Sequence, residues 1–138
     1  MNDQEIRNCV YQGAMNTLLF AVNKHDKWRV LYGGQEEDSR MMDLELILRF
    51  YALNCGNVYN SDKKKISLKQ TLNKYMQDNM HASDEFINEK ESEFCSAIDF
   101  VYTNFGEEAF FNLQNDLTKI RRRLYPTVFD SIMIATSI

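Results

Sequence analysis

The fold of this chain is decided by residues 40–53, which read RMMDLELILRFYAL. A helix with this sequence carries apolar side chains on nearly every face and leaves no wide polar stripe. Such a helix lies inside a protein rather than on its surface. The stretch therefore predicts a central helix around which the other elements pack.

An arginine, Arg49, interrupts this apolar helix. A buried guanidinium is costly unless it is paired and hydrogen-bonded. Its partner is Asp43, Glu45, a carboxylate elsewhere in the chain, a backbone carbonyl or a ligand. Glu45 precedes Arg49 by four residues, the favourable orientation for an ion pair on a helix, so we expect Glu45 to neutralise it.

Helical periodicity continues through almost all of the remaining sequence, and signals for β-strands are poor. The first helical stretch covers about residues 3–23, and Gly13 can divide it. N-terminal caps are predicted at Asp26, Asp43, Ser67 with Gln70, and Ser83, helix ends at Gly33, Gly56 and Gly106, and a first helical residue at Pro126. We therefore predict an all-α fold, an irregular bundle of five to seven helices.

The composition is that of a soluble single domain over residues 1–138, with 44% hydrophobic and 26% charged residues. No apolar run approaches the roughly 20 residues that span a bilayer, and the N-terminus shows no signal-peptide pattern. The cysteines Cys9, Cys55 and Cys95 are isolated and lack metal-binding spacing. We expect reduced thiols, a cytoplasmic location and no membrane partner.

Charge is distributed unevenly along the chain. Residues 61–74 and residues 119–123 each carry a net charge of +4, whereas residues 84–93 carry −4. Such runs are usually solvated faces, but they also fit a phosphate-binding patch or pairing between subunits or domains. The candidate nucleic-acid contacts are Lys63, Lys64, Lys65, Lys69, Arg121, Arg122 and Arg123.

Sequence patterns for catalysis are missing. There is no nucleophile elbow, Walker loop, dinucleotide-binding glycine pattern or metalloprotease helix. His25 and His81 stand alone, and Asp43 and Glu45 are too close in sequence to face each other on a helix. We expect no enzymatic activity, no metal and no cofactor.

Four segments of the chain, here called the resemblance segments, are residues 6–16 (IRNCVYQGAMN), 40–53, 67–76 (SLKQTLNKYM) and 124–133 (LYPTVFDSIM). In this order they resemble a family of bacterial anti-phage restriction proteins. These are the GmrSD-type proteins, whose N-terminal part has a ParB-like, nucleotide-hydrolysing fold.

The chain also departs from that family. Its nucleotide chemistry is attributed to an Asp-Gly-Gln-Gln-Arg motif, and its fused nucleases to a His-Asn-His pattern, and neither occurs here. The resemblance implies the helical part of such a protein, as a fragment or a stand-alone version, without the catalytic halves. It further implies a structural or interface cluster of Arg40, Asp43, Glu45 and Arg49, in which Arg40, Asp43 and Arg49 face the absent N-terminal half.

The expected function is a non-catalytic scaffold or interaction module related to modification-dependent restriction proteins. Its partner would be a catalytic domain or a second copy of the chain. Two alternatives remain: a stand-alone dimeric adaptor or inhibitor, and a helical domain that binds DNA without sequence preference.

Overall fold

A computed structural model describes residues 2–34, 36–38, 40–54, 67–107, 109–110 and 126–136. These residues form seven α-helices and no strand, which confirms the predicted all-α bundle. The helices are α1 (Asp3–Val10), α2 (Ala14–Val22), α3 (Asp26–Tyr32), α4 (Met42–Leu53), α5 (Leu68–Asp78), α6 (Asp84–Phe105) and α7 (Pro126–Thr136). Within the described part, no helix is long and apolar enough to cross a membrane.

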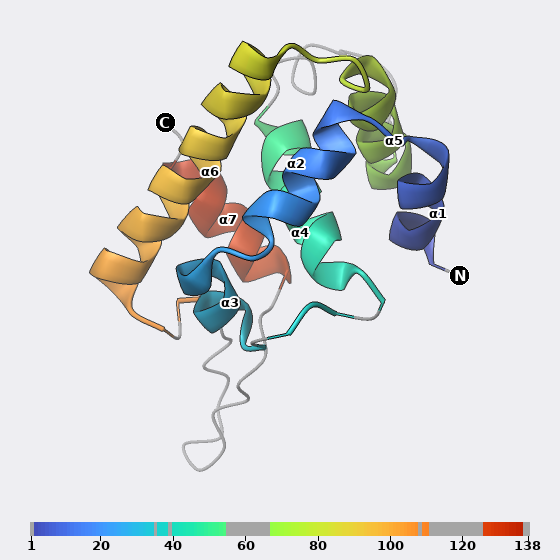
Figure 1. Cartoon of the computed structure of the whole chain (residues 1–138). Helices are drawn as coiled ribbons and strands as arrows, with labels where there is room; N and C mark the ends of the chain where they lie inside the picture. The colour runs from blue at the N-terminus through green and yellow to red at the C-terminus, as the bar shows by residue number, and fades with distance from the viewer. Residues whose placement is uncertain are drawn as a thin grey trace.

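Helix α4 is the central element, as its sequence predicts. It contacts α1, α2, α5, α6 and α7. In Figure 1 the long α6 runs along one side of the bundle, α1 and α5 lie on the other, and α2 and α4 lie between them. The buried residues of α4 are Asp43, Leu44, Leu46, Ile47, Leu48, Phe50, Tyr51 and Ala52.

A cluster of aromatic rings joins the helices around α4. Trp28 of α3 lies with its ring centroid 5.6 Å from those of Tyr32, Phe94 and Phe129. Phe129 of α7 in turn meets Phe110 at 5.0 Å. Each such pair adds about 0.5–1.5 kcal/mol beyond the apolar area it buries, so this cluster holds α3, α6 and α7 together.

Gly13 separates the first two helices for a steric reason. Its φ is +154°, and a Cβ atom there would lie 2.4 Å from the carbonyl oxygen of Met80. The same carbonyl accepts a hydrogen bond from the N–H of Ala14 at 3.0 Å. Only glycine allows the chain to approach the turn before α6 this closely.

Most predicted helix boundaries are confirmed. Ser67 and Gln70 form a capping box, Ser83 caps α6, Gly33 ends α3 at φ +92°, Gly106 follows α6 and Pro126 begins α7.

The predicted caps at Asp26 and Asp43 are wrong. His25 precedes α3, and Met41, at φ +59°, precedes α4 without a side-chain cap. Asp43 instead turns its carboxylate into the core, where it accepts hydrogen bonds from buried donors. Helix α4 ends at Leu53 with Asn54 as its cap, and the expected end at Gly56 lies outside the described residues.

Candidate functional site

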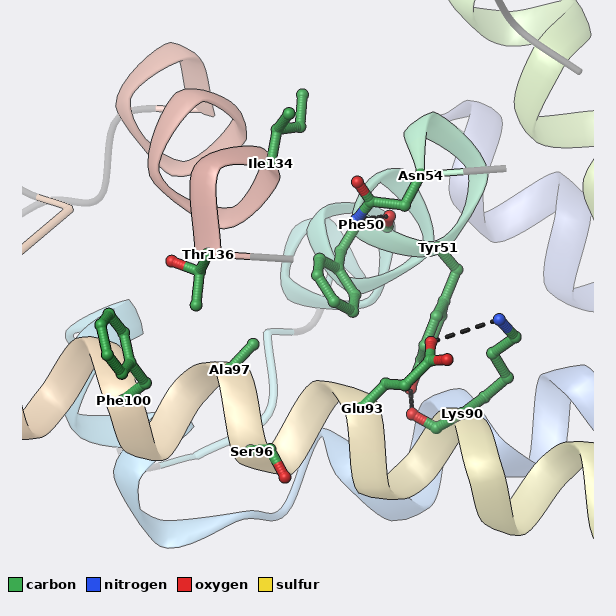
Figure 2. A pocket seen from close by; sticks show the side chains of 10 residues that line it. All are labelled: Phe50, Tyr51, Asn54, Lys90, Glu93, Ser96, Ala97, Phe100, Ile134 and Thr136. Atoms are coloured by element: carbon green, nitrogen blue, oxygen red, sulfur yellow. Dashed lines mark hydrogen bonds and ion pairs between the residues drawn. The ribbon is translucent and has the colours of Figure 1, made fainter. Parts of the chain in front are cut away.

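A groove of about 740 Å³ lies between the C-terminal half of α4, the middle of α6 and the C-terminal end of α7 (Figure 2). This volume is within the range of protein sites that bind ligands or peptides. The lining residues are Phe50, Tyr51, Asn54, Lys90, Glu93, Ser96, Ala97, Phe100, Ile134 and Thr136. We refer to it as the α4/α6/α7 groove.

Phe100 is the exposed aromatic residue of this groove. It is 52% exposed, whereas Phe50 and Tyr51 on the opposite wall are 4% and 3% exposed. Figure 2 shows Phe100 and Ala97 projecting from α6 on the same side, with Thr136 of α7 beside them. A large aromatic side chain at the edge of an apolar groove is typical of a surface that contacts a partner.

Lys90, Glu93 and Tyr51 of the groove have partners within the chain. Lys90 Nζ lies 3.2 Å from Glu93 Oε2 and 5.2 Å from the Phe86 ring centroid. The Tyr51 hydroxyl donates to the backbone carbonyl of Lys90 at 2.8 Å, and burial raises the pKa of Tyr51 above its ordinary value. Both the Lys90 amine and the Tyr51 hydroxyl are therefore engaged in contacts within the chain.

Asp43 is the centre of a second polar site, which is buried. Its Oδ2 accepts hydrogen bonds from Arg29 Nη1 at 2.7 Å, from Asn23 Nδ2 at 3.1 Å and from the N–H of Asp38 at 3.0 Å. Its Oδ1 accepts from the N–H of Leu44 at 2.9 Å. These donors offset the cost of removing the carboxylate from water, which is typical of a structural ion pair.

Arg29 extends this network to the chain between α3 and α4. Its guanidinium also donates to the carbonyls of Gly34 and Glu36 and to the side chain of Asn23. The same Asn23 oxygen accepts from Trp28 Nε1 at 2.9 Å. The network therefore fixes the α3–α4 connection against both helices.

Arg7 forms a third buried cluster, where α1 packs on α4 and α5. Its Nε donates to Asn73 Oδ1 at 2.7 Å and its Nη1 to Gln4 Oε1 at 2.9 Å. Burial lowers the pKa of Arg7, and the charge of Glu45 opposes that shift. Glu45 therefore lies close enough to Arg7 to act on it electrostatically.

The ion-pair partner of Arg49 is Asp130 of α7. The prediction that Glu45 neutralises Arg49 is wrong, because α7 packs across α4 and brings a competing carboxylate to the guanidinium. Burial raises the pKa of Asp130, and the charge and hydrogen bond of Arg49 oppose this rise. Among the described residues, Arg49 Nε and Asp130 Oδ1 have no hydrogen-bond partner.

The four residues predicted as an interface cluster are not brought together in one ion pair or network. Arg40 is exposed and pairs with Glu5 at 3.5 Å. Asp43 lies in the Arg29 network, and Arg49 pairs with Asp130. Because Asp43 is fully buried, it cannot present its carboxylate to an outside domain.

Only one predicted nucleic-acid contact can be placed. Lys69 is exposed on α5, with its Nζ 3.5 Å from Asp3 Oδ1. The other six, Lys63, Lys64, Lys65, Arg121, Arg122 and Arg123, lie outside the described residues.

The described part of the chain holds no group of three or more His, Cys, Asp or Glu side chains that could bind a metal. Cys9 and Cys95 are free thiols, and Cys55 is outside the described residues.

No protein-family model, no curated protein and no solved structure matches this chain. The function of the chain is therefore argued below from its own residues.

The groove was missed by sequence reasoning, although one signal points to it. Phe94, Ile98 and Val101 follow one apolar stripe of α6, and all three are buried. Phe100 lies about 100–160° away from these three residues on a helical projection, so an aromatic residue there is not required by the core.

Proposed function

We propose that this chain is a non-catalytic helical interaction module that binds a segment of another protein in the α4/α6/α7 groove. The observation that carries the proposal is the exposed Phe100 at the edge of a groove whose other aromatic walls are buried. Interfaces take much of their binding energy from a few aromatic residues in such positions. The Lys90 amine pairs with Glu93 and the Tyr51 hydroxyl donates to a backbone carbonyl, which favours binding over catalysis.

We further propose that the module serves in a phage-defence protein related to the GmrSD-type family. The support is that polar contacts join the four resemblance segments in two pairs. Arg7 of the first segment donates to Asn73 of the third, and Arg49 of the second pairs with Asp130 of the fourth. Polar residues that resemble those of a family are expected to form such contacts if their role is to hold one helical unit together.

Selection from a random helical-peptide library tests the groove directly. The library is selected on the parent chain and each selected peptide is then measured on Phe100→Asp and Phe105→Asp. Phe105 is the matched control, because it is 59% exposed on the same helix but does not line the groove. We expect selected peptides to lose binding to Phe100→Asp and to keep binding to Phe105→Asp.

The groove would be excluded as the binding site if every selected peptide bound Phe100→Asp as tightly as the parent chain. Both variants replace exposed side chains, so both should melt close to the parent chain. The purified parent should also release no phosphate from nucleoside triphosphates and cut no DNA. Activity above background that is lost on mutating a residue of this chain would contradict the non-catalytic part of the proposal.

A further inference from the structure

The groove is continuous with a charged stripe on α6. Glu85, Glu89, Glu93 and Phe100 are spaced four, four and seven residues apart, and all four are exposed. Residues at this spacing lie on one face of a helix. The stripe therefore carries carboxylates over its N-terminal half and the aromatic edge of the groove over its C-terminal half.

This stripe carries an excess of negative charge next to the groove. Lys90 pairs with Glu93, which neutralises that carboxylate locally. Glu85 and Glu89 have no ion pair among the described residues, so the three stripe carboxylates and Lys90 together carry a net charge of −2. Carboxylates beside an apolar groove attract a cationic partner and disfavour an acidic one.

The shape of the site indicates a helical occupant. Its walls are formed by side chains of three helices, and the described residues contain no sheet edge to which an extended peptide could add as a strand. From Glu85 to Phe100 the stripe is about 22 Å long at 1.5 Å per residue, which matches about four turns of a second helix. A helix in a groove uses apolar anchors at every third or fourth position.

We infer that the occupant of the α4/α6/α7 groove is a basic amphipathic helix of a partner protein. Its apolar face packs against Phe100, Ala97 and Phe50, and its lysines and arginines lie over Glu85 and Glu89. This inference rests on the proposed function and adds the chemical class of the partner.

Three synthetic peptides of about 18 residues test the inference. They share one set of leucine anchors at helical spacing and carry lysine, glutamine or glutamate at every polar position. Fluorescence anisotropy measures their binding at about 50 mM and about 500 mM NaCl. We expect the lysine peptide to bind about tenfold more tightly than the glutamine peptide at low salt, the glutamate peptide to bind most weakly, and the differences to shrink at high salt.

Two variants, each with a control variant, separate charge from apolar contact. The double variant Glu85→Lys/Glu89→Lys should remove the preference for lysine, whereas Glu91→Lys, on the opposite face of α6, should keep more than half of it. Phe100→Ala should weaken all three peptides by about fivefold or more, and Phe105→Ala should leave them unchanged. All the substituted side chains are exposed, so the fold should be retained.

The outcomes distinguish this inference from the proposed function. If the three peptides bind with equal affinity and still depend on Phe100, the partner is not basic, but the groove remains the proposed binding site. If the lysine peptide binds equally well to the parent and to Phe100→Ala, its binding is general electrostatic attraction. That result contradicts both the proposed groove and the basic partner helix. A doubled mass in light scattering that Phe100→Ala restores to the mass of one chain would make a second copy the occupant and overturn the partner helix.

Discussion

Arg29–Asp43 and Arg49–Asp130 both join α4 to another helix, but they differ in how completely their polar atoms are hydrogen-bonded. Asp43 accepts four hydrogen bonds, and its side chain is 1% exposed. Asp130 is 18% exposed, accepts one bond from Arg49 and leaves its second oxygen without a partner among the described residues.

This difference indicates different roles for the two pairs. The saturated pair fixes an irregular connection, because Arg29 also holds two backbone carbonyls of the α3–α4 segment. The singly bonded pair lies between two regular helices whose apolar faces already pack together. A partly buried pair of the second kind contributes little net stability compared with apolar side chains of the same size.

The largest effect is expected from breaking the saturated pair. Asp43→Ala leaves the Arg29 guanidinium buried without a counter-charge and removes the acceptor of Asn23. We expect the free energy of unfolding to fall by about 3–5 kcal/mol, measured by urea denaturation. Glu37→Ala, an exposed acidic residue of the same connection, is the control and should change stability by less than about 0.5 kcal/mol. An Asp43→Ala chain as stable as the parent would mean that the network does not hold the connection.

A smaller effect is expected from the singly bonded pair. Asp130→Ala strands a partly exposed guanidinium and should cost about 1–3 kcal/mol. Arg49→Leu/Asp130→Leu should melt near the parent or above it, because apolar residues replace an incompletely bonded ion pair. Melts of Arg49→Leu, Asp130→Leu and the double variant give the coupling energy of the pair. A coupling energy as large as the loss expected for Asp43→Ala would remove the distinction between the two pairs.

The comparison also shows what the sequence could predict. The central position of α4 was predictable, because its own apolar residues leave no polar face. The partner of Arg49 was not, because Asp130 is 81 residues away and a local carboxylate at four residues appeared sufficient. The groove was not predictable either, since it forms only where α4, α6 and α7 meet, although Phe100 already departed from the core stripe.

The pH dependence of stability should differ between variants of the second pair. The pKa of Asp130 is raised above its ordinary value of 3.8, so the folded state holds that proton more tightly than the unfolded state does. Its contribution to stability is therefore present at low pH and is lost as pH rises above that value. Arg49→Leu removes the charge that opposes the rise, so the pH dependence should increase.

Urea denaturation of Arg49→Leu and of Arg49→Leu/Asp130→Asn between about pH 4 and pH 7 measures this effect. The single variant should gain stability relative to the double variant as pH falls. The other carboxylates are the same in both chains, so their titration cancels in the difference. A constant difference across this range would show that Asp130 does not titrate there.

The smallest effect is expected at Arg40, which begins the segment that decides the fold. Its side chain is 65% exposed, and its Nε lies 3.5 Å from Glu5 Oε1. Exposed ion pairs of this kind contribute about 0–1 kcal/mol, because water and salt screen them. Arg40→Ala should therefore change the free energy of unfolding by less than about 1 kcal/mol, and the change should vanish at high salt. A loss comparable to that of Asp130→Ala would mean that exposure does not set the order of the three ion pairs, and that Arg40 contributes through the packing of α1 against α4 instead.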